Sequence, residues 1–222
     1  VTLKENTNET LDLIYNIDLG EKALIKNIIF TGERYYKDKK LKNIIVSEES
    51  KFWKFISNKK YLNPSQIDLD LRLLEKFYLN KGFYNVRIKN SSAIFNDNHF
   101  NLIYNIDAGN IYTIRNTKLV LPDDFDEKDF KEVDDILKKL EEKKYSLLKL
   151  NRVVKQIDKI SVSRLYDFID ATIETEIVEN DKLDITFLVK ESEKFYVKKI
   201  NVLGNNITEE RVIRDMLEVD EG

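Results

Sequence analysis

The chain has 222 residues, of which 42% are hydrophobic and 35% charged, so it can bury a core and carries a heavily charged surface. Its 37 Lys and Arg residues nearly balance its 40 Asp and Glu residues, which argues against nucleic acid as the main partner. The absence of cysteine excludes disulfides and thiolate metal sites, and no apolar run approaches the roughly 20 residues of a membrane-spanning helix.

An internal repeat organises the sequence. The hexapeptide LIYNID occurs at residues 13–18 and again at 102–107, an offset of 89 residues, and a looser copy follows at 185–190. Near-equal spacing predicts a tandem array of one small unit. Both ends of the chain interrupt a repeat, so we expect a fragment of a longer protein. We expect four parts: the C-terminal strands of a truncated unit at 1–20, complete units at 21–108 and 109–191, and the N-terminal part of a truncated unit at 192–222.

The first complete unit opens with a strand marked by Ile25, Ile28 and Phe30 and ended at Thr31-Gly32. The gap of three residues breaks strict alternation and predicts a β-bulge. The same spacing occurs in the next unit, at Ile114, Thr117 and Leu119, and in the last part, at Val197, Ile200 and Val202. A short helix at 38–46 is expected to follow the first of these strands.

A second helix is predicted to begin at Asn63-Pro64, an N-cap residue followed by proline at the first helical position. Its apolar face is formed by Ile67, Leu71, Leu74 and Tyr78, and Gly82 is expected to stop it. Alternating residues then predict a strand at 84–95, a turn at 96–98 and a strand at 100–107.

The second complete unit repeats this order, and we expect its strands at 111–120, 171–178 and 183–190. The inward residues of its two helices are predicted to be Phe130, Val133, Leu137 and Leu140 in the first and Leu150, Val153, Ile157 and Ile160 in the second. A further helix is expected at 209–217, in the truncated unit that follows.

The connections predict the sheet topology. A short turn makes the third strand antiparallel to the second, and a right-handed crossover lays it parallel to the first. The third strand is then central and the second is an open edge. The fold class is therefore α+β, with tandem β-α-α-β-β units, each a three-stranded mixed sheet covered on one face by two antiparallel helices. Short linkers such as residues 18–21 predict a semi-rigid, elongated array.

Three motifs carry a family resemblance. They are FTGE at residues 30–33, the helix-to-strand run LLEKFYLNKGFY at 73–84, and the junction IDAGN at 106–110. These motifs resemble the POTRA repeats of the BamA family of outer-membrane protein assembly factors. The long link at 47–62 resembles the third repeat, which makes 109–191 the fourth and leaves the end of the second and the start of the fifth at the termini. Two segments depart from the pattern, Leu121-Pro122 and residues 166–168.

The resemblance implies a non-enzymatic scaffold of the β-barrel assembly machinery, on the periplasmic side of the bacterial outer membrane and without a cofactor. The implied partners are accessory lipoproteins and nascent outer-membrane β-barrel proteins, with an outer-membrane β-barrel attached in the full-length protein. Two alternatives stay open: the POTRA region of a two-partner secretion transporter or TamA-type factor, and tandem nucleic-acid-binding α/β modules. The near-neutral charge disfavours the second, which would also need stacking aromatics on an open sheet face.

Two surfaces are candidates for partner binding. The first is the predicted edge strand, where an extended partner can add a strand, with the residues Tyr84, Asn85, Val86, Arg87, Ile88 and Lys89. The competing interpretation is an ordinary edge protected by its charges. The second is the aromatic patch Phe52, Trp53 and Phe55, whose residues more often cap a core than contact a partner.

Nothing in the sequence indicates catalysis or metal binding. His99 is the only histidine and lies beside a turn, so it lacks companion ligands. The acidic pairs at 123–124 and 134–135 are expected to be solvated. The six glycines never cluster as a phosphate-binding loop requires, and such small units leave little room for a pocket.

Overall fold

The computed structural model describes residues 2–5, 11–14, 24–51, 58–89, 92–97, 99–166, 169–179, 181–191, 197–204 and 208–217. The chain divides into two compact units, Val1–Tyr112 with Lys144–Leu147, and Thr113–Lys143 with Leu148–Gly222. The finer division into four parts and the numbering of the repeats stay predictions.

The first unit contains two paired strands followed by the strands and helices of one repeat. Its elements are β1 (Thr2–Glu5), β2 (Leu11–Ile14), β3 (Leu24–Glu33), α1 (Asp38–Lys42), the 3₁₀ helix η1 (Asn58–Lys60), α2 (Pro64–Leu79), β4 (Arg87–Lys89), β5 (Ala93–Asn96) and β6 (His99–Asp107). β1 and β2 pair antiparallel.

The main sheet of the first unit has the predicted topology. β6 is central, pairs parallel with β3, and pairs antiparallel with both β4 and β5 on its other side. The register between β3 and β6 shifts between Ile25 and Asn27, so the bulge predicted from the spacing is confirmed. A connection through two helices makes this parallel pairing possible.

The start and end of α2 follow from its local sequence. Asn63 Oδ1 accepts a hydrogen bond from Ser65 N–H at 2.9 Å, and Pro64 is the first helical residue. After the helix, Gly82 has a φ of +103°, which glycine adopts without strain, and Phe83 N–H donates to the Tyr78 carbonyl at 3.2 Å. The prediction for this helix is confirmed, whereas α1 ends at Lys42, before the predicted residue 46.

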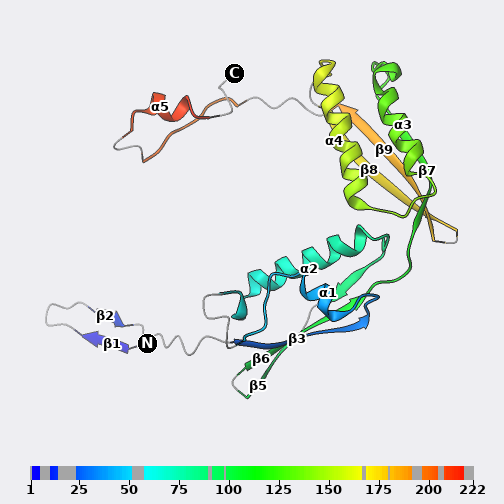
Figure 1. Cartoon of the computed structure of the whole chain (residues 1–222). Coiled ribbons are helices and arrows are strands. Elements are labelled where there is room, and N and C mark those ends of the chain that lie inside the picture. Colours follow the sequence, from blue (N-terminus) through cyan, green and yellow to red (C-terminus); the bar gives the residue numbers. More distant parts are fainter. Residues whose placement is uncertain are drawn as a thin grey trace. The chain divides into compact units, whose positions relative to one another are not determined.

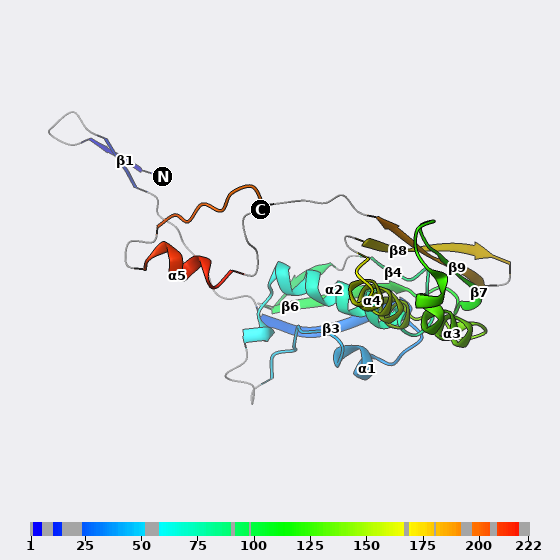
Figure 2. The same cartoon turned by 90° about the horizontal axis from the view of Figure 1, so that it is seen from above.

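The core lies between the helices and one face of the sheet (Figures 1 and 2). Leu41 of α1 and Leu74 and Tyr78 of α2 are fully buried against Leu102 and Tyr104 of β6. Apolar residues at a spacing of two along β6 and at helical spacing along α2 therefore meet in one cluster.

The second unit repeats this arrangement. Its elements are β7 (Thr113–Val120), the 3₁₀ helix η2 (Glu127–Phe130), α3 (Lys131–Leu140), α4 (Leu147–Ser163), β8 (Ile169–Val178), β9 (Lys182–Glu191) and α5 (Glu210–Arg214). β9 is central, parallel to β7 and antiparallel to β8, with α3 and α4 side by side over one face (Figures 1 and 2). All eight predicted inward residues of α3, α4 and the turn before them are buried.

The bulge recurs at the equivalent position. The register between β7 and β9 shifts between Ile114 and Asn116, which lie 89 residues after Ile25 and Asn27. The repeat spacing of the sequence therefore extends to an irregularity of the backbone.

The predicted strand at 84–95 is wrong in extent. Residues 84–86 form a turn, in which Tyr84 N–H donates to the Gly82 carbonyl at 3.0 Å and Val86 N–H to the Phe83 carbonyl at 3.3 Å. Within the predicted range, the described strands are β4 and β5, and both pair with β6. Their registers differ by one residue, because Lys89 faces Asn105 whereas Ala93 faces Leu102.

Two further expectations need correction. Residues 197–203 form no strand among the described residues, although their spacing matches the first strands of both complete units. A first strand in those units is held by the third strand of the same unit, and the described residues after 191 supply none. The last helix is α5, which is shorter than the predicted 209–217.

Candidate docking edges

The predicted docking residues divide between a turn and a short strand. Arg87, Ile88 and Lys89 form β4, with Arg87 exposed and opposite Asp107 on β6. β4 is outermost in the sheet order, so its outer edge has no strand beside it among the described residues. These three of the six predicted residues therefore lie on an open edge, as expected, but the edge strand is only three residues long.

The other three residues lie in the turn for a packing reason. The Tyr84 ring contacts the rings of Tyr112 and Tyr145, with centroid distances of 5.7 and 5.1 Å. Asn85 Nδ2 donates to the Tyr112 hydroxyl at 2.7 Å, and Val86 is 7% exposed. Burial raises the pKa of Tyr145 to about 12, with a smaller contribution from Tyr84. These side chains are therefore engaged within the first unit, and Val86 is not available to a partner.

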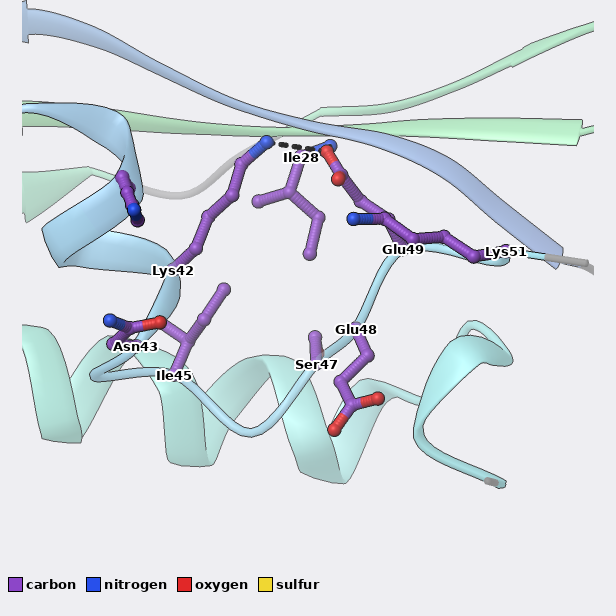
Figure 3. Close-up of a pocket in the computed structure, with 9 residues that line it drawn as sticks. Ile28, Lys42, Asn43, Ile45, Ser47, Glu48, Glu49 and Lys51 are labelled. Atoms are coloured by element: carbon purple, nitrogen blue, oxygen red, sulfur yellow. Dashed lines mark hydrogen bonds and ion pairs between the residues drawn. The ribbon is translucent and has the colours of Figure 1, made fainter. Parts of the chain in front are cut away.

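The opposite edge of the same sheet is closed by a loop (Figure 3). The Ile25 carbonyl on β3 accepts from Ser50 N–H at 2.7 Å, and Ile28 N–H donates to Glu49 Oε1 at 3.0 Å. Glu49 also accepts from Lys42 Nζ of α1 at 2.5 Å. Two backbone groups of β3 that an added strand would need, the Ile25 carbonyl and the Ile28 N–H, are thus already satisfied.

Burial raises the pKa of Glu49, but the hydrogen bonds from Lys42 and Ile28 N–H and the charges of Lys42 and Lys51 lower it more. Its pKa therefore lies below the usual value for a glutamate, and the carboxylate is charged at neutral pH.

A groove of about 550 Å³ lies beside this closed edge. Its lining residues are Ile28, Lys39, Lys42, Asn43, Ile45, Ser47, Glu48, Glu49 and Lys51. This groove is more space than the sequence led us to expect for so small a unit. Two glutamates line it, Glu48 and Glu49. Glu49 is committed to Lys42 and to β3, which gives it a structural role and not one in acid–base chemistry.

The second unit closes its first strand in the same way. Thr117 N–H and Thr117 Oγ1 both donate to Glu141 Oε1 at 3.1 Å, while Glu142 N–H donates to the Ile114 carbonyl at 2.8 Å. Thr117 lies 89 residues after Ile28. In both units, therefore, a glutamate from the connection between the helices accepts a hydrogen bond from the equivalent backbone N–H. Sequence reasoning did not identify these glutamates, because a charged residue in a polar loop has no periodicity to mark it.

The edge of β8 is open and longer than that of β4. All ten residues of β8 pair with β9 in one continuous register, from Ile169 opposite Glu191 to Val178 opposite Lys182. β8 is the outermost strand, and no backbone hydrogen bond of the described turns and loops involves residues 169–178. Since β8 pairs on one side only, alternate N–H and C=O groups point away from the sheet.

A buried polar network was also missed by the sequence reasoning. Asp70 of α2 is fully buried and accepts hydrogen bonds from Val46 N–H at 2.5 Å, Ser47 N–H at 3.2 Å and the Tyr104 hydroxyl at 2.6 Å. Burial raises the pKa of Tyr104, and its hydrogen bond to Asp70 raises it further. The network joins α2 to the loop after α1 and to the central strand β6.

The remaining candidates are His99 and the two acidic pairs. The ring Nδ1 of His99 lies 2.9 Å from the Asp97 carbonyl at the start of β6, and the acidic pairs at 123–124 and 134–135 are exposed. Within the described ranges, no group of three or more His, Asp or Glu side chains is placed to hold a metal ion. None of the helices in the described part of the chain combines the length and hydrophobicity that crossing a membrane requires. Phe52, Trp53 and Phe55 lie outside the described residues.

Comparisons with known proteins agree with this architecture. Residues 23–109 match the POTRA family, described as a surface antigen variable number repeat. The chain is 24% identical over 217 residues to the outer membrane protein assembly factor BamA of Neorickettsia risticii, an alignment that covers 96% of the chain and 28% of that protein. It is 24% identical over 205 residues to BamA of Neisseria meningitidis serogroup B, covering 92% of the chain and 26% of that protein. The chain thus spans little more than a quarter of the length of these relatives.

Solved structures show the same fold. The crystal structure of Haemophilus influenzae BamA POTRA3-5 aligns with a TM-score of 0.65 and 19% identity, covering 91% of this chain and 79% of that one. BamA from Haemophilus ducreyi lacking POTRA domains 1-3 aligns with a TM-score of 0.55 and 13% identity, covering 78% of this chain and 30% of that one. Residues 23–109 therefore match the POTRA family, and the chain as a whole is similar in sequence to BamA and in fold to solved BamA POTRA repeats.

Proposed function

We propose that this chain is part of a non-enzymatic scaffold on the periplasmic side of the bacterial outer membrane. In this role it docks accessory lipoproteins and nascent outer-membrane β-barrel proteins, and its full-length parent carries an outer-membrane β-barrel. A role in outer-membrane protein assembly is supported by the relatives, which are named outer membrane protein assembly factors. The scaffold role is supported by an observation on this chain.

The observation that carries the proposal is the asymmetry of the two sheet edges. In both units a glutamate and a loop hydrogen-bond to the first strand, whereas the second strand has no neighbour beyond it among the described residues. An extended segment that joins the open edge gains main-chain hydrogen bonds without displacing any part of the repeat. The proposed docking residues on the first unit are Arg87, Ile88 and Lys89 of β4.

Proline substitution tests this proposal directly, because proline deletes one N–H and fixes φ. In the first unit Arg87→Pro and Ile88→Pro are both needed, since the two residues point their N–H groups in opposite directions. Thr172→Pro and Ile173→Pro serve the same purpose on β8. The matched controls are alanine at the same four positions, and circular dichroism confirms that each variant folds.

The measurement is the affinity of the whole chain for a fluorescent peptide with the alternating polar and apolar pattern of a β-barrel strand. We expect one proline variant of each neighbouring pair to weaken binding at its edge, whereas the alanine variants change affinity only modestly. If all four folded proline variants bind the peptide as tightly as the unsubstituted chain, neither β4 nor β8 is a docking edge. The aromatic patch Phe52, Trp53 and Phe55 would then become the next candidate.

A further inference from the structure

We infer that the β8 edge of the second unit selects an extended partner strand with basic side chains at alternate positions and apolar side chains between them. This inference rests on the proposed strand addition and names the chemistry of the strand that this edge accepts.

The backbone of β8 suits an added strand better than the β4–β5 edge does. β8 offers ten residues in one register, whereas β4 and β5 are short and their registers on β6 differ by one residue. A change of register interrupts the regular row of outward N–H and C=O groups. A partner strand of seven or eight residues can therefore pair continuously along β8 but not along β4 and β5.

β8 carries two glutamates on the sheet face that points away from the helices. Glu174 and Glu176 are exposed on this face, and they lie opposite Thr186 and Asp184 of β9. Glu176 thus faces another carboxylate, and Glu174 faces a neutral side chain. Like charges directly opposite one another destabilise a sheet, so a basic residue on the far side of β8 would relieve this arrangement.

The nearby basic groups lie on the two inner strands of the sheet and not on β8 itself. Arg115 of β7 is committed to Asp184, with its Nε 2.9 Å from Oδ1 and an ion pair through Nη2, and it lies one strand further from the edge. Lys118 of β7 lies beyond Thr186, and Lys190 lies opposite Asp170 at the other end of β8. Glu174 forms no ion pair within the described parts of the chain. The charge of Arg115 also acts on Glu176, and Lys182 lies on the same face of β9, opposite Val178. All of these basic groups lie on β7 or β9, inward of the two glutamates, so the outermost strand presents Glu174 and Glu176 to a partner.

The opposite face of β8 is mainly apolar, with Thr175 between two isoleucines. Ile173 lies opposite Phe187 and Ile177 opposite Leu183, and both partners are fully buried beneath the helices. Ile173 is only half-buried, and Ile177 is 50% exposed because it sits at the border of the sheet. Apolar side chains from an added strand would extend this row and cover both isoleucines. The two faces together specify alternating basic and apolar residues.

The β4 edge has the opposite character. Arg87 is exposed on its open face, where it lies opposite Asp107. A basic strand would meet like charge there, which provides an internal contrast within the same chain.

Three labelled peptides of equal length test the inference, with isoleucine alternating with lysine, with glutamate or with threonine. Their affinities for the whole chain are measured by fluorescence anisotropy at low and at physiological salt. The double variant Glu174→Gln/Glu176→Gln removes the acidic border, and Glu127→Gln/Glu132→Gln makes the same charge change at exposed positions of η2 and α3. Two lysine analogues, N-methylated on one or the other set of alternate residues, test main-chain pairing without altering the protein.

We expect the lysine peptide to bind on the order of tenfold more tightly than the glutamate peptide, from cross-strand charge pairs at two positions. The preference should shrink at higher salt and in the Glu174/Glu176 variant, and persist in the Glu127/Glu132 variant. One of the two N-methylated peptides should lose binding.

The outcomes separate this inference from the proposed function. Equal affinity for all three peptides, with one N-methylated analogue inactive, would overturn the charge selection and leave strand addition standing. An unchanged lysine preference in the Glu174/Glu176 variant would overturn the assignment to β8. Tight binding of both N-methylated analogues would refute strand addition, and the inference would fall with it.

Discussion

Replacement of Glu49 by alanine should destabilise the first unit and leave the second unit unchanged. Glu49 is the only described acceptor for Ile28 N–H, and Ile28 is 2% exposed. A buried N–H left without an acceptor costs about 1 to 3 kcal/mol. The Lys42–Glu49 pair is partly exposed, at 34% and 19% for the two side chains, so its loss adds about 1 kcal/mol at most. We expect a total loss of about 2 to 3 kcal/mol in the free energy of unfolding.

The assay is urea denaturation followed by circular dichroism, with hydrogen-exchange mass spectrometry to assign the transition to residues 24–51. With a urea dependence of roughly 1 to 3 kcal/mol per molar, the midpoint of the first unit should fall by about 0.7 to 3 M. Glu49→Gln retains an acceptor oxygen and should cost only about 1 kcal/mol. Glu75→Ala, at an exposed position of α2, is the matched control and should change stability by less than about 0.5 kcal/mol.

The pH dependence follows from the lowered pKa of Glu49. A carboxyl group whose folded pKa lies below its unfolded value, about 4.3, stabilises the fold above that value and loses the contribution as the pH falls through the folded pKa. The stability difference between the parent and Glu49→Gln should therefore shrink as the pH falls below about 4. An unshifted urea midpoint in Glu49→Ala, or a difference that stays constant down to pH 3, would refute the role assigned to Glu49.

Three further substitutions test the packing of the first unit, two in its core and one at the end of β3. Leu74→Ala should cost about 2 to 5 kcal/mol because Leu74 is fully buried, and an unchanged urea midpoint would contradict its inward orientation. Tyr104→Phe removes one donor to the buried Asp70 and should cost about 1.5 to 3 kcal/mol, measured in the same assay; a neutral effect would show that Asp70 does not depend on this bond. Gly32→Ala should cost about 2 kcal/mol or more, because Gly32 has a φ of +81° and an added Cβ would lie 2.3 Å from the Ile106 carbonyl oxygen. A loss below about 0.5 kcal/mol in thermal or urea unfolding would show that this strand end rearranges easily.

The sequence by itself determined the features that depend on local or periodic signals. The 89-residue offset recurs as the distance between the bulges of the two units, and the gap between Ile25 and Ile28 predicted the first of these bulges. Asn63, Pro64 and Gly82 set the limits of α2, since capping and a left-handed turn need only neighbouring residues. Strand order followed as well, because connection length and handedness leave few topologies open.

Only the tertiary structure decided how far each open edge extends and which groups close the first strand. Tyr84 to Val86 alternate like a strand, yet the ring of Tyr84 is held by Tyr112 and Tyr145, and the backbone follows that packing into a turn. The closure of β3 by Glu49 depends on a contact across 21 residues, which leaves no pattern in the sequence around either partner. The burial of Asp70 likewise arises because donors from two other segments converge on it. Edges and buried polar groups are set by which segments meet in space, and hydrophobic periodicity reports only which face of each segment turns inward.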